Sequence, residues 1–254
     1  RMVAACEKHK VKLAMAHPTR YSPKLPVIRN LIDDGVIGRV LELRGRGKED
    51  RRGGGEDLWV LGSHIFNLMH FFGGEPSWCF ARLLENNLPV TKENVVDGAE
   101  GIGKLAGDGV SAMYGMEESV TGFFGTQRDT AGGRFALQIC GSKGIIEIVT
   151  GFLPQAFLLQ DPMWSPGRSG KQWIPISSAG AGKEEPIKVA TSHLGNVAAC
   201  TDLLLAIEED RQPECSIYEG RTVVEMIAGV FESHRQRRPV EMPLKNRENP
   251  LTLL

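Results

Sequence analysis

The sequence predicts an α+β fold, with a large open sheet of mixed or antiparallel strands and helices on one face of it. Strand patterns follow one another from residue 76 to residue 149, which favours neighbouring antiparallel strands. The two longest helical patterns come afterwards, at residues 192–209 and 217–234. The chain starts with a predicted helix at residues 1–9 and a short strand at residues 11–16, without an opening strand or glycine turn. We therefore expect the chain to begin in the middle of an α/β unit.

The segment before the sheet has clear boundary signals. Ser22 is a suitable helix cap and Pro23 suits the first turn, while Gly35 is a natural stop for that helix. An alternating strand is predicted over residues 39–48, with three cations on one face. A strongly apolar helix is predicted from Leu58 to about Phe72.

Within the sheet region, residues 110–116 alternate and are followed by a second strand at residues 120–124. Residues 135–140 and 145–149 flank a Gly-Ser-Lys-Gly turn and predict a hairpin. Residues 161–190 are predicted to form a long loop with one strand around Trp173, and the end of the chain is predicted to be extended and irregular.

Composition excludes several classes of partner. The 254 residues are 41% hydrophobic and 24% charged, with a net charge of −1, so we expect neither nucleic acid nor an anionic membrane as partner. No apolar run reaches the ~20 residues of a membrane span. The five cysteines are widely spaced and form no Cys-x-x-Cys pair. This pattern predicts reduced thiols, a cytoplasmic protein and no metal site.

Two glycine motifs between Gly98 and Ala106 resemble phosphate-binding loops but lack their context. Leu105 stands where a phosphate loop needs Ser or Thr, and the preceding segment is a poor buried strand. The spacing Gly101-x-Gly103-x-x-Ala106 resembles a dinucleotide fingerprint, but the glycines that follow prevent the required helix. We expect a structural lead into a strand here.

The segment from Gly53 to Met69 is the most informative. It places His64 on an apolar helix, where Val60 and Asn67 would share its face. Taken alone, a histidine in such a helix is more often structural than catalytic, and both interpretations stay open.

These residues resemble the substrate-domain signature of the glucose–fructose oxidoreductase, inositol dehydrogenase and rhizopine catabolism (Gfo/Idh/MocA) family, in which three glycines precede a Gly-x-His on an apolar helix. Other segments resemble the family in the same order along almost the whole chain. They are the strand and crossover at residues 15–21, the Gly-x-Ile-Gly type segment at 31–40, the hairpin at 139–146 and the ending around 237–244.

The resemblance implies hydride transfer between NAD or NADP and a sugar, polyol or sugar acid. It assigns His64 to taking the proton of the substrate hydroxyl. The aspartate that family members often place four residues earlier is Val60 here, and Asn67 replaces a common acid. The family's lysine lies in the nucleotide domain and has no counterpart in this sequence. Catalysis is therefore expected to be altered or lost if His64 cannot act without these groups.

Further substrate contacts are predicted from the same resemblance. Arg46 and Lys48 stand near the end of the first sheet strand, and Arg20 stands in the crossover after the nucleotide-domain strand. Guanidinium and ammonium groups suit hydroxyls, carboxylates and phosphates. Asn67 is added as a hydrogen-bonding residue. A solvated strand face and a surface salt bridge are the alternatives for these cations.

The resemblance also implies a domain organisation. Residues 1–17 would be the residual end of a Rossmann-type dinucleotide-binding domain, residues 18–240 the substrate and oligomerisation domain, and residues 241–254 an extended tail. The broad sheet is expected to pair with a second copy into a homo-oligomer. No cofactor-binding residues are identified.

A second function remains open, namely a non-catalytic module that binds carbohydrate or builds an oligomer. Val60 and the absence of a convincing phosphate loop favour it. A generic hydrolase has no support, because no nucleophile elbow and no paired carboxylates are found.

Overall fold

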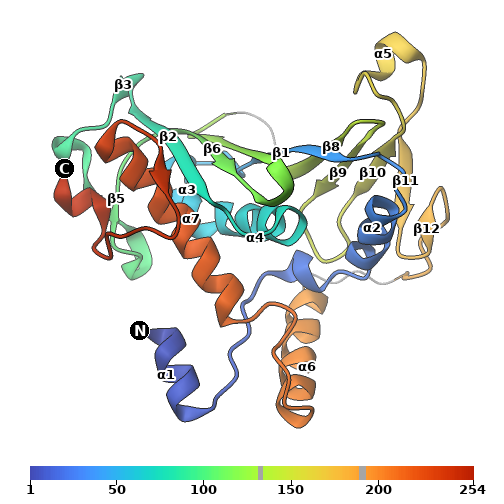
Figure 1. Ribbon diagram of the computed structural model, residues 1–254, viewed down its shortest axis with the longest axis horizontal. Coiled ribbons are helices and arrows are strands. Elements are labelled where there is room, and N and C mark those ends of the chain that lie inside the picture. The colour runs from blue at the N-terminus through green and yellow to red at the C-terminus, as the bar shows by residue number, and fades with distance from the viewer. Residues whose placement is uncertain (131–133, 189–192) are drawn as a thin grey trace. The chain divides into compact units, whose positions relative to one another are not determined.

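The computed structural model describes residues 1–130, 134–188 and 193–254 (Figure 1). The fold is α+β, with helices and a large, mostly antiparallel sheet, as the sequence predicts. The described chain divides into two compact units. The first comprises residues 1–40 and 138–222, and the second comprises residues 41–137 and 223–254.

The first unit contains the strands that follow residue 138. β8 (Ala136–Gly141), β9 (Ile145–Val149), β10 (Ala156–Leu159), β11 (Ile174–Ser177) and β12 (Gly180–Ala181) follow each other in space as in sequence. The pairs from β9 to β12 are antiparallel. The helices of this unit are α1 (Met2–His9), α2 (Lys24–Asp33), α5 (Pro166–Ser169) and α6 (Leu194–Glu208), and α7 (Ile217–Gln236) begins here.

The second unit is built on four long strands in the order β1 (Val40–Arg46), β7 (Thr121–Gln127), β6 (Gly109–Gly115) and β2 (Trp78–Glu85). β1 and β7 are parallel, whereas β7–β6 and β6–β2 are antiparallel. The short strands are β3 (Leu88–Pro89), β4 (Val96–Asp97), β5 (Lys104–Leu105) and β13 (Val240–Glu241). The helices are α3 (Gly55–Val60), α4 (Gly62–Gly73) and most of α7.

Helices cover one face of this four-stranded sheet. From α4, the Phe66 ring packs against Phe124 with centroids 4.4 Å apart and against Tyr114 at 5.7 Å. From α7, the Met226 carbonyl accepts a hydrogen bond from the Tyr114 hydroxyl at 3.0 Å. Because alternate residues of a strand point to opposite faces, every second residue of each strand faces these helices. The unit's core therefore lies between the sheet and the pair α4 and α7.

The opposite face of the sheet, which we call the outer face, is exposed and partly aromatic. The strand register aligns Phe80, Met113, Phe123 and Arg44 in one row across β2, β6, β7 and β1. Phe80 is 42% exposed and Phe123 is 37% exposed.

Three expectations about elements need correction. Residues 11–16 form no strand in this structure, only an isolated bridge between Ala14 and Ser216. The helix predicted from Leu58 to Phe72 is two helices, because the backbone leaves helical geometry at Leu61, with φ −123°. The sequence also missed β10, whose four residues are too few for a clear alternation.

None of the five cysteines is bonded to another, and no group of His, Cys, Asp and Glu side chains that the structure describes could hold a metal ion. Among the described helices, none has both the length and the apolar character that a membrane crossing requires.

Candidate functional site

The Gly53-Gly54-Gly55 segment allows a close backbone approach at the start of α3. A Cβ on Gly55 would stand 2.1 Å from the Ala106 carbonyl oxygen, and one on Gly54 would stand 2.3 Å from the Gly107 carbonyl oxygen. Gly54 also has a φ of +82°, which favours glycine. The Gly55 N–H donates to the Gly107 carbonyl at 2.9 Å. The three glycines therefore fix α3 to the loop before β6.

Asp57 anchors the same junction from inside. Its side chain is fully buried and accepts a hydrogen bond from the Thr126 hydroxyl, which in turn accepts from the Gly54 N–H at 3.3 Å. Burial raises the pKa of Asp57, and the hydrogen bond from Thr126 opposes part of that effect. Asp57 thus ties α3 to β7 beneath the segment that leads to α4.

His64 lies in the first turn of α4, immediately after the break at Leu61. Its side chain is half-buried, and the edge of its ring meets Phe135, with centroids 6.2 Å apart and planes at 80°. Burial lowers the pKa of His64 below its ordinary value. The imidazole is therefore mostly neutral at neutral pH, which is the form that accepts a proton.

Asn67 follows His64 by three residues and shares its side of α4, as the sequence predicts. The side chain is only 1% exposed. Val60, in contrast, belongs to α3, so the common helical face expected for Val60 and His64 does not form. The break lets Gly62 pack closely, because a Cβ there would stand 3.0 Å from the Phe124 ring.

Arg46 lies on the other face of the sheet from α4. The neighbouring Gly45 faces Ile65 and Met69 of α4, so the side chain of Arg46 points to the outer face, where it covers Gly125. There it pairs with Glu49. The strand alternation therefore separates Arg46 from His64, although the two residues are only 18 positions apart in the sequence.

Lys48 and Arg20 already have acidic partners. The Lys48 ammonium is exposed and stands 3.4 Å from Asp50, whose pKa Arg52 lowers to about 2 through a hydrogen bond. In the first unit, the Arg20 guanidinium is 3.7 Å from Glu214. Its side chain is 11% exposed, and burial lowers its pKa.

Two residues next to His64 and Arg46 were not identified from the sequence. Phe135 precedes a strand and gave no signal beyond its apolar character, because its contact with His64 exists only in the folded chain. Glu49 follows β1 with a φ of +61°, and its side chain is fully buried. A charged residue at the end of a strand is ordinarily solvated, so the sequence does not predict its burial.

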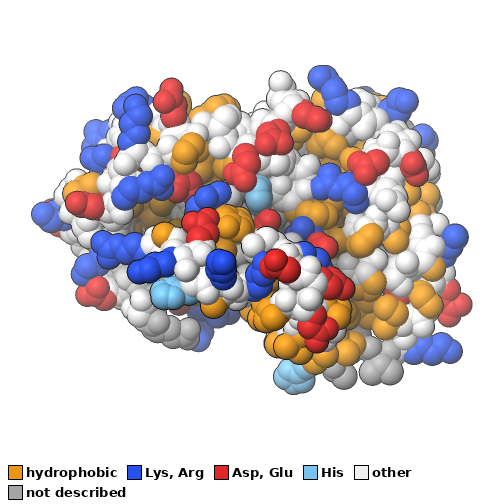
Figure 2. Space-filling model, turned by 60° about the horizontal axis from the view of Figure 1, so that its bottom comes forward, with side chains coloured by type: hydrophobic (Ala, Val, Ile, Leu, Met, Phe, Trp, Pro, Cys, Tyr) orange, Lys and Arg blue, Asp and Glu red, His pale blue; other side chains and the backbone are white. Residues whose placement is uncertain are grey.

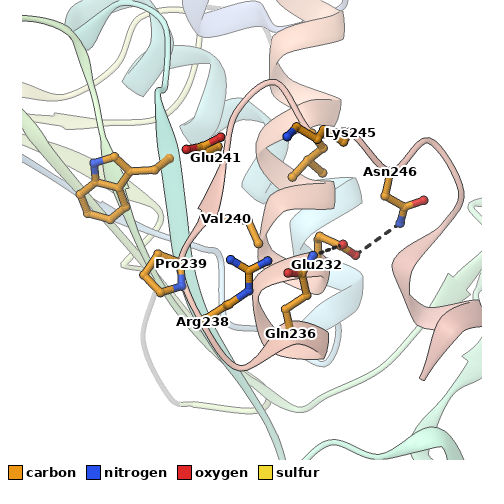
Figure 3. Close-up of a pocket in the computed structure, with 10 residues that line it drawn as sticks. Glu232, Gln236, Arg238, Pro239, Val240, Glu241, Lys245 and Asn246 are labelled. Carbon is orange, nitrogen blue, oxygen red and sulfur yellow. Dashed lines mark hydrogen bonds between the residues drawn. The ribbon is translucent and has the colours of Figure 1, made fainter.

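A polar pocket of about 430 Å³ opens at the end of α7 (Figure 3). None of the predicted site residues lines it. Its buried acid, Glu232, accepts hydrogen bonds from Arg235, Gln236 and Asn246, so its oxygens already have donors. The hydrogen bonds of Glu232 therefore give this pocket a structural explanation.

The described residues do not form a nucleotide site. The glycines from Gly98 to Gly103 lie in a short 3-10 turn between β4 and β5, and these two-residue strands pair with each other. The next described element after β5 is β6, so these glycines do not lead into the helix N-terminus that a phosphate-binding loop needs. A nicotinamide cofactor finds no phosphate cradle among the residues that the structure describes.

Part of the chain matches a known protein family. Residues 27–147, from α2 through β9, match the family model described as the GFO/IDH/MocA C-terminal domain. No curated protein matches the chain.

Solved structures show the same fold. Levoglucosan dehydrogenase in complex with NADH and levoglucosan is 18% identical, with a TM-score of 0.67 over 91% of this chain and 66% of that one. An NAD-binding oxidoreductase from Klebsiella pneumoniae is 16% identical, with a TM-score of 0.72 over 96% of this chain and 70% of that one. An aldose–aldose oxidoreductase from Caulobacter crescentus, complexed with glycerol, is 17% identical, with a TM-score of 0.67 over 95% and 67%.

At these identities the similarity establishes the fold alone. The chain spans 66% of the length of the levoglucosan dehydrogenase structure, which is just under two thirds. The resemblance expected from the sequence is confirmed by residues 27–147, which match the model of the GFO/IDH/MocA C-terminal domain.

Proposed function

We propose that this chain is the substrate side of an NAD(P)-dependent oxidoreductase that acts on a sugar, polyol or sugar acid. The observation that supports it best is His64, a neutral, half-buried imidazole in the first turn of α4, within the segment that matches the family. Residues 1–17 would be the end of a nucleotide-binding domain. That domain would hold the cofactor, which supplies the hydride acceptor.

The proposed role of His64 is to take the proton from the substrate hydroxyl. A base that is neutral at working pH can do this without a second acid nearby, and a positioned base contributes roughly 10²–10⁴-fold to the rate. Val60 cannot accept a proton. His64 is therefore the proposed catalytic residue, alone among the side chains of α3 and α4.

Asn67, Arg20, Arg46 and Lys48 stay predicted as substrate-binding residues. The position of Asn67 on the same side of α4 as His64 supports its role. The ion pairs of Arg20, Arg46 and Lys48 support structural roles beside any contact with substrate. None of the five cysteines forms a disulfide, which supports a reducing compartment, such as the cytoplasm.

A second candidate is a non-catalytic module that binds carbohydrate or assembles with other copies. Val60 favours it, because the acid common in the family is missing. The two functions differ in cofactor binding. A fluorescence titration of the native protein with NADH should show saturable binding if the enzyme proposal is right. If no binding is seen at millimolar NADH, the non-catalytic module is the candidate that remains.

The direct test of the enzyme proposal is His64→Ala in the native protein. We expect turnover of a sugar or polyol to fall by roughly 10²–10⁴-fold, because the proton acceptor is lost, while NADH affinity is unchanged. His70→Ala is the matched control, since His70 lies on the same helix and pairs with Glu75 at 3.0 Å. Unchanged turnover in His64→Ala would rule out the assigned role.

A further inference from the structure

The aromatic side chain of Phe135 lies beside His64. Phe135 meets the His64 ring edge-on, and both side chains are half-buried rather than part of the closed core. A partly open aromatic ring next to a proton acceptor limits which atoms of a ligand can approach that acceptor. The ring has no polar atom, so it accepts C–H groups and leaves a hydroxyl without a hydrogen-bond partner.

The residue before Phe135 is held by a buried ion pair. The Arg134 guanidinium Nε lies 2.8 Å from an oxygen of Glu49, whose side chain is fully buried. Arg46 contacts the other oxygen of the same carboxylate. Arg134 and Arg46 are both partly exposed, with side-chain exposures of 55% and 41%. Burying a carboxylate without charged partners is costly, so the two ion pairs hold Arg134 and Arg46 at Glu49.

The backbone at Glu49 supports the same interpretation. Its φ of +61° is a conformation that residues with a side chain seldom adopt, and it persists only where surrounding contacts hold it. The contacts here include the two arginines and a hydrogen bond from the Glu49 backbone to the Asp57 carboxylate. Arg134 is thereby fastened to the end of β1, and Phe135, the next residue, is positioned against His64.

We propose that Phe135 contacts the substrate and determines specificity, and that Glu49 is a positioning residue that acts on it through Arg134. Phe135 would pack against a C–H face of a sugar or polyol carbon next to the reacting hydroxyl. A stereoisomer that turns a hydroxyl toward the ring would lose that hydrogen bond on binding and be rejected. This inference rests on the proposed function and deepens it.

The first measurement follows the His64 ring by NMR titration and needs no turnover. Phe135→Ala admits water to the imidazole, so the pKa of His64 should rise toward its ordinary value. Phe157→Ala, at a half-buried phenylalanine on β10, is the matched control and should leave the titration unchanged. An unchanged titration in Phe135→Ala would overturn the contact.

The second measurement compares sugar and polyol stereoisomers with the native protein. Phe135→Ala should lower kcat/KM for the preferred isomer by roughly 10–200-fold and reduce the ratio between isomers. Arg134→Gln should change both in the same direction and less strongly, because it removes the ion pair between Arg134 and Glu49. Glu49→Gln should also change both in that direction, because it removes the charge that holds Arg134. Arg134 is exposed, so its replacement keeps the test valid if the Glu49 variant fails to fold.

The outcomes separate the two proposals. If the native protein oxidises a sugar and the isomer ratio of Phe135→Ala is unchanged, the specificity role is wrong while the enzyme proposal stands. If Phe135→Ala changes the ratio but Arg134→Gln and Glu49→Gln do not, the positioning role of Glu49 is wrong. If the native protein oxidises no sugar, polyol or sugar acid with NAD or NADP, the enzyme proposal fails and the specificity role fails with it.

Discussion

At the scale of single residues, the contrast between His64 and Asp57 shows how burial selects the form of a titratable group. Burial disfavours the charged form of both side chains, so it lowers the pKa of the imidazole and raises that of the carboxyl. For Asp57, the hydrogen bond donated by the Thr126 hydroxyl offsets part of this cost. His64 needs no such compensation, because the form that burial favours is the form a proton acceptor requires.

A pH dependence follows from the lowered pKa of His64. Protonation removes the acceptor, so kcat/KM should rise with pH through the pKa of the free protein and be constant above it. Because that pKa is lowered, the rise should be centred below about 6.5, the ordinary histidine value. The profile of kcat/KM between pH 4.5 and 8 checks this, and a midpoint above 6.5 would contradict it.

At the scale of elements, the sequence predicts those whose pattern is long and regular. The helices at residues 192–209 and 217–234 correspond to α6 and α7, and the alternating strand at residues 110–116 corresponds to β6. The local sequence pattern does not predict an element boundary that is set by a tertiary contact. The break at Leu61 depends on Gly62 meeting Phe124 of β7, a contact 62 residues away that no window of the sequence contains.

Tertiary contacts also decide how much the glycines at the start of α3 matter. We predict that replacing Gly55 lowers the free energy of unfolding, whereas replacing a glycine with open space around it does not. Gly55→Ala should destabilise the protein by about 1–3 kcal/mol or more, because the new Cβ meets the backbone oxygen of Ala106 and neither can move freely. Gly167→Ala is the control, since nothing stands within 4 Å of a Cβ there. Urea unfolding measures both, and equal midpoints would contradict the packing role.

Another prediction concerns the junction between α7 and β2. The His234 ring accepts a hydrogen bond from the Leu83 N–H at 3.2 Å and its other nitrogen lies 2.9 Å from the Val90 carbonyl. His234→Ala leaves both partly buried backbone groups unpaired, so the free energy of unfolding should fall by about 1–3 kcal/mol. His9→Ala, at an exposed position, should leave it unchanged. Thermal and urea unfolding of the two variants distinguish these outcomes.

At the scale of the whole molecule, the candidate site could be predicted only in part. The order of segments along the chain identified the family resemblance and placed His64 and Asn67 on one helix. The strand pattern puts the cations on one face, but it could not show which face α4 covers, because the contact of Gly45 with Ile65 exists only in the folded chain. Nor could it bring Phe135 to His64 across 71 positions.

The outer face of the second unit leads to the last prediction, which concerns assembly. Figure 2 shows that hydrophobic side chains also reach the surface elsewhere, and α6 exposes several of them, namely Val197, Leu204, Leu205 and Ile207. On the outer face, however, the row that contains Phe80 and Phe123 runs across four neighbouring strands. Such an aromatic sheet face is suited to pairing with a second copy.

We therefore expect the native protein to be an oligomer in sedimentation velocity, and Phe80→Glu to shift it toward the monomer, because two facing glutamates would be buried without partners. Leu88→Glu is the matched control: Leu88 is 69% exposed on the short strand β3, away from the aromatic row. If the wild-type protein sediments as a monomer at micromolar concentration, the outer face does not pair copies of this chain. If Phe80→Glu leaves an oligomer intact, the copies meet through a different surface, and the exposed apolar side of α6 is the next place to substitute.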